Sequence, residues 1–188
     1  DKQHYQEGFF IYDIPTFNEH VVREAILNAV SHRNYQMGGR VFVRQYRDRL
    51  VVESPGGFPN GITVENILDR QSPRNQRVAE ILALCGLVER SGQGMNLMYE
   101  WSVKEAKQLP DFTGTDENFV KLTLNGMVLD AKMLSLINRI GNERMESFST
   151  TDFLVINALL PCRGSSAEYE SKPKAFRNAG RSRTYWSQ

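Results

Sequence analysis

The chain has 188 residues, of which 40% are hydrophobic and 24% are charged, and its formal net charge is +1. This is ordinary globular composition, long enough for one sizeable core and a small appendage. A net charge so near zero excludes a general attraction to nucleic acid or membranes, so any such binding must come from a local patch. Cys85 and Cys162 lack the spacing of a zinc site or of a secreted disulfide scaffold. With neither a membrane-spanning apolar run nor a signal peptide, we expect a cytoplasmic protein that does not bind membranes.

The first residues indicate a piece of a longer protein, because the chain starts at Asp1 without a methionine. We expect residues 1–14 to be an extension from an upstream domain. A helix is expected to follow Pro15, since Thr16 can cap its free amides while Glu19 returns the bond as a capping box. This helix should reach about Tyr35.

Two apolar, β-branched runs at 40–46 and 50–53 predict a β-hairpin that turns at 47–49. The second strand breaks at Ser54-Pro55-Gly56-Gly57, and the turn residues that follow predict a flexible connection over 58–73. Later helices and a last strand are expected at the following positions: helices at about 75–84, 95–108, 128–140 and 148–160, and a strand at 119–124.

The first helix places Glu24, Asn28, Ser31 and Tyr35 within about 60° of one another, with His32 beside them. Such a stripe is most often a solvated helix face. The spacing Glu-x-x-x-Asn also suits a nucleotide site. In such a site the Asn carbonyl holds a magnesium ion on the phosphates, and a carboxylate one turn earlier orients an attacking water.

Glycines near this helix are the second feature that fits a phosphate site. Gly56, Gly57, Gly92 and Gly94 lack a Cβ where the backbone turns or approaches a ligand, and the last two open a helix whose free amides favour phosphate oxygens. A glycine in a loop is usually only a turn residue. The pairing with Glu24 and Asn28 is what supports the phosphate interpretation.

Several segments together resemble one family in the same order. Residues 24–35 resemble the N-box of GHKL-type (Bergerat) ATPase domains, and 48–63 resemble the family's strand, its Ser-Pro-Gly-Gly turn and the start of its lid. Residues 89–95 resemble the second glycine box, and 119–124 the closing strand. Residues 15–127 are thus identified as similar to the C-terminal GHKL-type domain of RecG-like, Schlafen/AlbA-associated bacterial transcriptional regulators.

This resemblance implies an α/β (α+β) two-layer sandwich, a Bergerat-type mixed sheet covered by helices on one face, with ATP and Mg²⁺ between the helices. Glu24 would be catalytic by activating water, and Asn28 would be the metal ligand. The residues expected to contact ATP or its phosphates are Asn28, Gly56, Gly57, Gly92, Gly94, Glu53, His32 and Arg74. His32 could equally be a packing residue at a helix end, and Arg74 a solvated residue before a helix.

The implied function is an ATP-binding regulatory module of a DNA-associated transcriptional regulator, possessing at most slow ATPase activity, whose nucleotide state biases conformation or homodimerisation. A P-loop helicase is excluded from this segment because no G-x-x-x-x-G-K-[ST] motif occurs.

One departure supports an alternative. The GHKL class reads the adenine amino group with an Asp at the first glycine box, where this chain has Ser54. Glu53 lies one residue away, but a shift of one residue along a strand points a side chain to the opposite face. The alternative is therefore a nucleotide-free structural or dimerisation module.

The C-terminal residues 128–188 are expected to form a helical segment followed by a basic tail, either winged-helix-like or disordered. Its cations are not offset by any acid between them, and aromatic residues lie among them. They could follow a phosphate backbone, which leaves a DNA-binding winged-helix protein as a third interpretation. The cations are Lys172, Lys174, Arg177, Arg181 and Arg183.

Overall fold

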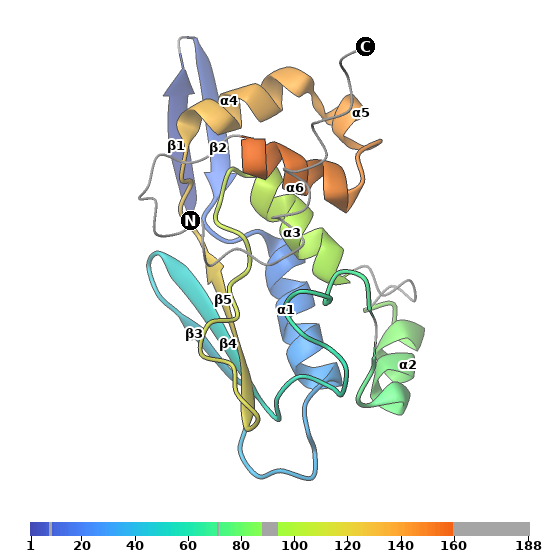
Figure 1. Cartoon of the computed structure of the whole chain (residues 1–188). Coiled ribbons are helices and arrows are strands. Elements are labelled where there is room, and N and C mark those ends of the chain that lie inside the picture. Colours follow the sequence, from blue (N-terminus) through green and yellow to red (C-terminus); the bar gives the residue numbers. More distant parts are fainter. Residues whose placement is uncertain (8, 71, 88–93, 160–188) are drawn as a thin grey trace, which may run out of the picture.

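The computed structural model describes residues 1–7, 9–70, 72–87 and 94–159. Within these residues the strands form two separate antiparallel sheets (Figure 1). The first is a hairpin of β1 (Lys2–Glu7) and β2 (Phe10–Pro15). The second has three strands in the order β3-β4-β5, namely β3 (Phe42–Gln45), β4 (Arg49–Pro55) and β5 (Phe119–Asn125). The hairpin predicted over residues 40–53 is confirmed by the antiparallel pairing of β3 with β4.

Five of the helices match the predicted positions to within a few residues, except at the ends of the first and third, and the short helix Asn142–Met145 was not predicted. The helix bounds are α1 (Glu19–Ser31), α2 (Gln76–Leu84), α3 (Gly94–Lys104), α4 (Ala131–Ile140), α5 (Asn142–Met145) and α6 (Thr150–Leu159). In Figure 1, α1, α2 and α3 lie on one side of the three-stranded sheet. This agrees with the expected layer of helices on one face. No helix in the described part of the chain is long and apolar enough to cross a membrane.

The larger sheet is antiparallel, so the expectation of a mixed sheet was wrong. The reason lies in how the chain returns after α3. Residues 105–118 run back past the sheet and turn beside Gly56, whose amide donates to the Asn118 carbonyl at 2.7 Å. Because β5 then starts where β4 ends, the two strands run in opposite directions. The only parallel pairing in the described residues is an isolated bridge between Gly56 and Phe119.

Helix α1 begins later and ends earlier than predicted. Its N-cap is Asn18, whose side chain accepts a hydrogen bond from the His20 amide at 3.0 Å. Thr16 is not the cap, because it is buried and its amide donates to the Asp1 carbonyl at 2.9 Å. The helix stops at Ser31 with His32 as its C-cap, and the chain then turns away, so that the Asn34 amide donates to the Pro55 carbonyl at 2.8 Å. The helix is nevertheless amphipathic, because Val21, Ala25 and Ala29 recur every four residues and form its buried face.

Two clusters of buried residues form the core. In the first, the apolar face of α1 packs on Leu50, Val52, Leu122 and Leu124 of the sheet, together with Met98 of α3 and Phe112. The second joins the end of α3 to the helices of residues 131–159, with Phe153 and Leu134 almost completely buried. Tyr5, Tyr12 and Ile14 of the N-terminal hairpin pack against this second cluster.

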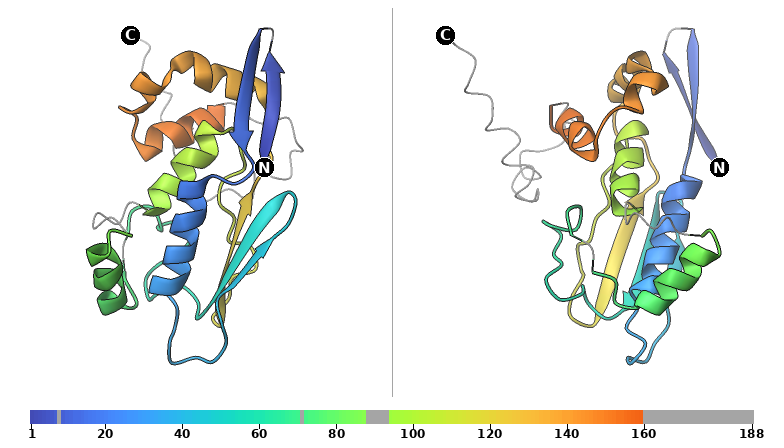
Figure 2. Two further views of the ribbon diagram at one scale, coloured as in Figure 1. Left: turned by 180° about the vertical axis from the view of Figure 1, so that it is seen from behind. Right: turned by 90° about the vertical axis from the view of Figure 1, so that its right-hand side faces the viewer.

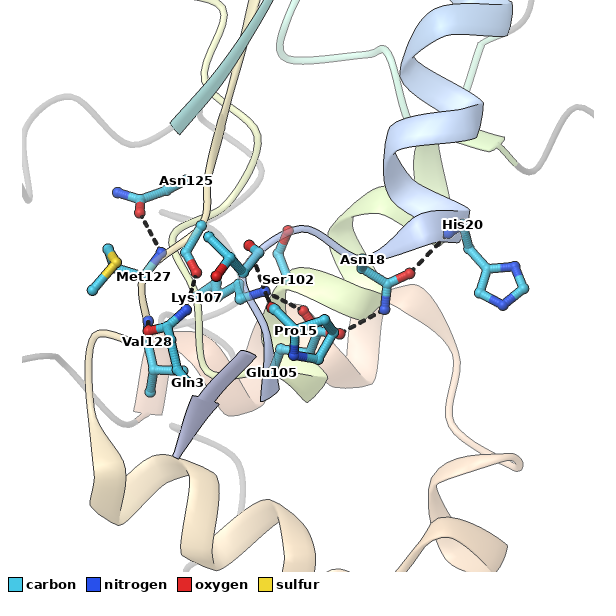
Figure 3. Close-up of polar contacts among 12 residues, drawn as sticks. Gln3, Pro15, Asn18, His20, Ser102, Glu105, Lys107, Asn125, Met127 and Val128 are labelled. Carbon is cyan, nitrogen blue, oxygen red and sulfur yellow. Dashed lines mark hydrogen bonds and ion pairs between the residues drawn. The ribbon is translucent and has the colours of Figure 1, made fainter. Parts of the chain in front are cut away.

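A buried ion pair fastens the junction between β2 and α1 (Figure 3). The Lys107 ammonium donates to the Glu105 carboxylate at 2.5 Å and to the Pro15 carbonyl at 2.6 Å. Asn18 donates to the other Glu105 oxygen, also at 2.5 Å. Burial lowers the pKa of Lys107, while Glu105 opposes that shift. All partners of this cation come from the segment before α1 or the one after α3, so it fixes the two helices relative to each other.

Candidate functional site

A cleft of about 1540 Å³ lies between α1, the 56–73 connection, α2 and the start of α3. These elements can be followed in Figure 2. Six of the predicted site residues line it: Glu24, Asn28, His32, Gly56, Gly57 and Gly94. Glu53 and Arg74 are not among the lining residues, and Gly92 lies outside the residues that the structure describes. The cleft therefore brings together residues that are up to 70 positions apart in sequence.

Glu24 lies directly against the first turn of α3. A Cβ placed on Gly94 would stand 1.6 Å from Glu24 Oε1 and 2.2 Å from its Cδ, so only glycine leaves room for this carboxylate. The close approach occurs because the middle of α1 crosses the N-terminus of α3. That helix end carries partial positive charge and favours a carboxylate beside it.

Asn28 follows Glu24 by one helical turn and faces the same cleft. Its backbone carbonyl accepts the His32 amide at 2.9 Å and closes α1. Its side-chain amide makes no hydrogen bond to any residue that the structure describes. An amide oxygen in this position is available to a ligand in the cleft.

His32 caps the C-terminal end of α1, and its imidazole is largely buried. Burial lowers the pKa of His32, and the positive charge of Arg74 lowers it further. The ring is therefore neutral near pH 7. Its Nδ1 atom is buried without a hydrogen-bond partner in the described part of the molecule. An unpaired buried nitrogen costs free energy, and such an atom in a cleft wall often marks a ligand or an ordered water.

The glycine turn after β4 is shaped by close packing. Gly56 has a φ of +91°, and a Cβ there would lie 2.3 Å from Arg74 Nη1. Arg74 donates to the Gly57 carbonyl at 2.7 Å, which ties the connection to the turn. The Gly57 amide donates to the Glu117 carbonyl at 3.0 Å, and the Gly56 amide is bonded as described above. Both amides thus donate to backbone carbonyls within the protein, and the absence of a Cβ at these two positions allows the close packing of this turn.

Neighbouring residues of β4 face opposite sides of the sheet. Ser54 is buried, lines the cleft and donates its hydroxyl proton to the Ala29 carbonyl of α1 at 2.7 Å. Glu53 lies on the far face, where it pairs with Arg44 of β3. The structure therefore does not bring Glu53 to the cleft. With its proton committed to Ala29, the Ser54 oxygen presents only lone pairs, which accept a hydrogen bond from an N–H donor.

Two sets of contacts around the cleft were not predicted from the sequence. Asn75 donates to the carbonyls of Ser31 and Arg33 at 2.8 and 2.7 Å, so it holds the last turn of α1. Residues 148–150, at the start of α6, line the cleft, and Thr150 donates to Glu100 of α3 at 2.6 Å. A Ser-x-x-Asp capping box at 149–152 is visible in the sequence and predicts that a helix begins there. It contains no information about what that helix packs against.

No cluster of three or more His, Cys, Asp or Glu side chains occurs in residues 1–7, 9–70, 72–87 and 94–159. The predicted DNA-binding cations, Lys172 to Arg183, lie outside the described residues.

The comparisons with known proteins agree with the motifs. A family model described as "Putative ATP-dependent DNA helicase recG C-terminal" matches residues 38–124. The crystal structure of the DIP2311 protein from Corynebacterium diphtheriae is similar, with a TM-score of 0.67 and 30% identity. That match covers 84% of this chain and 32% of the other, so the chain spans about a third of the protein it matches. No curated protein matches.

The family match starts after α1, so Glu24 and Asn28 lie before the matched segment. The matched segment contains the three-stranded sheet, the connection, α2 and α3. Residues 38–124 are therefore similar to the RecG C-terminal ATPase-like family.

Proposed function

We propose that this domain binds ATP with Mg²⁺ in the cleft between α1, the 56–73 connection and α3. The observation that carries the proposal is the pairing of Glu24 and Asn28 on one wall of the cleft, with Glu24 fitted against Gly94. The family description supports it because it names an ATP-dependent protein. A cleft of about 1540 Å³ has more than enough room for a nucleotide.

Asn28 fits the role of a magnesium ligand. Mg²⁺ in nucleotide sites keeps several waters and takes one or two protein oxygens in addition to those of the phosphates. One amide oxygen without a protein partner therefore meets the requirement, and a cluster of carboxylates is not needed. ATP, when bound, would supply the γ-phosphoryl group that is transferred to water, with ADP as the leaving group.

Glu24 fits the role of the residue that orients water. Its carboxylate lies one turn from Asn28 and at the N-terminus of α3, where amides and a partial positive charge favour phosphate oxygens. From there it can accept a hydrogen bond from water and hold that water in line for attack. Turnover is expected to be slow, with nucleotide binding as the main event.

Ser54 can receive the adenine amino group. Ser54 lines the cleft, and its hydroxyl oxygen offers lone pairs because its proton is donated to the Ala29 carbonyl. A neutral acceptor is weaker than the carboxylate that the wider class uses. We therefore expect weaker affinity for ATP than in a domain that has Asp at this position.

Calorimetric titration of MgATP into the 188-residue chain tests the proposal. Asn28→Ala should abolish the heat of binding, whereas Asn60→Ala, a matched change at an exposed residue outside the cleft, should not. Loss of binding in both variants, or in neither, would contradict the assignment of Asn28. Absence of binding to the wild-type chain at millimolar ATP would refute the proposal.

A second candidate is a nucleotide-free structural or dimerisation module. The observation that favours it is the hydrogen bond from Ser54 to Ala29. Ser54 stands where the GHKL class has the Asp that binds adenine, and here this side chain already has a partner within the protein. In that case the chain should self-associate equally with and without ATP. Sedimentation velocity at both conditions separates the two candidates.

The nucleotide is proposed to act on conformation through α6. Phe148, Ser149 and Thr150 line the cleft, and α6 is joined to α3 by the Thr150–Glu100 hydrogen bond. A nucleotide in the cleft would therefore bias how α6 sits on α3, or how two copies associate, within a DNA-associated regulator. Limited proteolysis should show slower cleavage near residues 145–150 in the presence of MgATP. Unchanged cleavage under saturating nucleotide would contradict this regulatory role.

The basic tail is proposed to add DNA binding in the intact protein. Binding to duplex DNA should then fall steeply with salt and be lost when residues 171–188 are removed. If the truncated chain bound duplex DNA as well as the whole chain, the tail would have no part in it.

A further inference from the structure

The side of the three-stranded sheet opposite α1 carries an unusual combination of side chains. We define the outer face by the residues of the β3–β4 hairpin that point away from α1: Phe42, Arg44, Tyr46, Arg49, Val51 and Glu53. Phe42 is 48% exposed and Tyr46 43% exposed. In Figure 1 no described helix covers this side of β3 and β4. Two aromatic rings are therefore held in water on a rigid sheet.

Arginines are stacked on both rings. The Arg44 guanidinium lies 4.8 Å from the centre of the Phe42 ring, and that of Arg49 lies 4.5 Å from the centre of the Tyr46 ring. Stacking fixes each guanidinium plane, so fewer rotamers are lost when its N–H groups bind a ligand. Arg44 is also paired with Glu53.

The hairpin is basic although the whole chain is almost neutral. Residues 40–53 contain four arginines, Arg40, Arg44, Arg47 and Arg49, and two acids, Asp48 and Glu53, which leaves a net charge of +2. Both acids contact arginines of the hairpin. Arg40 and Arg47 are exposed and make no ion pair with the residues that the structure describes. They are available to an anionic partner.

Exposed aromatic rings on a sheet, bordered by cations, are the features that bind single strands of nucleic acid. Bases stack on the rings, and the arginines contact the phosphates. A duplex hides its base faces, so it cannot use the rings. A flat apolar protein interface would bury the rings but would leave Arg40 and Arg47 without partners.

We propose that the outer face of the β3–β4 hairpin binds single-stranded nucleic acid. Bases stack against the two ring–arginine pairs, Phe42 with Arg44 and Tyr46 with Arg49. Arg40 and Arg47 contact the phosphates. This site is separate from the cleft, which lies across the sheet on the side of α1. It is also separate from the basic tail. It does not depend on the proposed binding of ATP.

Fluorescence anisotropy with labelled oligo(dT) and oligo(rU) of about 15 nucleotides tests the proposal on the 188-residue chain. Phe42→Leu with Tyr46→Leu keeps apolar volume but removes stacking, and it should weaken binding at least about 20-fold. Arg40→Gln with Arg47→Gln should flatten the slope of log affinity against log salt by about 1.4. The control, Arg139→Gln with Arg144→Gln, makes the same charge change on α4 and α5 and should bind as the wild type does.

Binding of either oligonucleotide with this pattern of loss supports the proposal, and the ratio of dT to rU affinity distinguishes DNA from RNA. Three results would overturn it: no binding by the wild-type chain, tighter binding to a duplex of the same length, or full binding by the hairpin variants. Binding that is lost only on removing residues 171–188 would also overturn it. A photocrosslink from 5-iodouracil in the strand should map to Phe42 or Tyr46 of the unmodified chain, which checks the site without any variant.

Discussion

Replacing Gly94 with Ala should separate the fold of this domain from its chemistry. The new Cβ would stand 1.6 Å from Glu24 Oε1, whereas an ordinary contact begins near 3.4 Å, so the carboxylate must withdraw by about 1.8 Å. The atoms in its way are the end of a flexible side chain, so Glu24 should move and the backbone should not. The φ of Gly94 is not positive, and alanine favours helix more than glycine does, so the melting temperature should not fall.

If Glu24 positions the attacking water, this displacement should lower the rate of ATP hydrolysis about 100-fold, because a misplacement of about 1 Å can cost that much. The affinity for ATP should change little, since Asn28 is untouched. A single-turnover assay with protein in excess measures even slow hydrolysis. Gly38→Ala is the matched control, because a Cβ there has no neighbour within 4 Å. Hydrolysis by Gly94→Ala at the wild-type rate would refute the role given to Glu24.

The remaining predictions concern stability. Lys107→Met should lower the free energy of unfolding by about 3–5 kcal/mol, measured by guanidinium denaturation, because it leaves the buried Glu105 carboxylate without its cation. Adding Glu105→Gln should recover part of that loss. An additive effect of the two changes would contradict the pairing. Burial lowers the pKa of His32 from its ordinary 6.5, so the unfolded chain takes up this proton first and stability should be lost as pH falls below 6.5. In thermal melts His32→Gln should flatten that fall, and an unchanged pH profile would argue against it. Gly57→Ala should lower the free energy of unfolding by about 1–3 kcal/mol in the same denaturation assay, because its Cβ would lie 2.5 Å from the backbone oxygen of Asp116. A stability equal to the wild type would show that the turn can open.

Local patterns in the sequence were enough to predict one wall of the cleft. A four-residue apolar spacing predicts which face of α1 is buried, and the remaining face carries Glu24 and Asn28 into the cleft. The alternation of β-branched residues likewise predicts the β3–β4 hairpin. These features depend on neighbours three or four positions away in a helix, or on a tight turn, so they can be recovered without knowing the rest of the fold.

Features that depend on distant partners could not be predicted. Thr16 is also an N-cap residue by type, but it is buried and its amide donates to the Asp1 carbonyl, so it does not cap the helix. The glycine pair at 56–57 predicts a turn, but its sequence does not show that the two amides donate to the carbonyls of residues 118 and 117. The position of α6 at the cleft depends on packing against α3, which leaves no local signature. In each case a long-range contact overrides a correct local rule.

The alternation of β4 explains how one short strand takes part in two surfaces. Ser54 points to α1 and the cleft, and Glu53 points to the outer face, where it holds Arg44 beside Phe42. Glu53 therefore cannot take the place of Ser54 in the cleft, because successive side chains along a strand point to opposite faces of the sheet. In the proposed nucleotide site, the side chain of Ser54, and not that of Glu53, contacts adenine. Ser54→Ala should accordingly lower the affinity for ATP without changing the affinity for single-stranded nucleic acid. Glu53→Gln releases Arg44 on the outer face, so it should change the affinity for single strands and leave the affinity for ATP unchanged. Anisotropy and calorimetry on the same two variants decide whether the sheet separates the two sites.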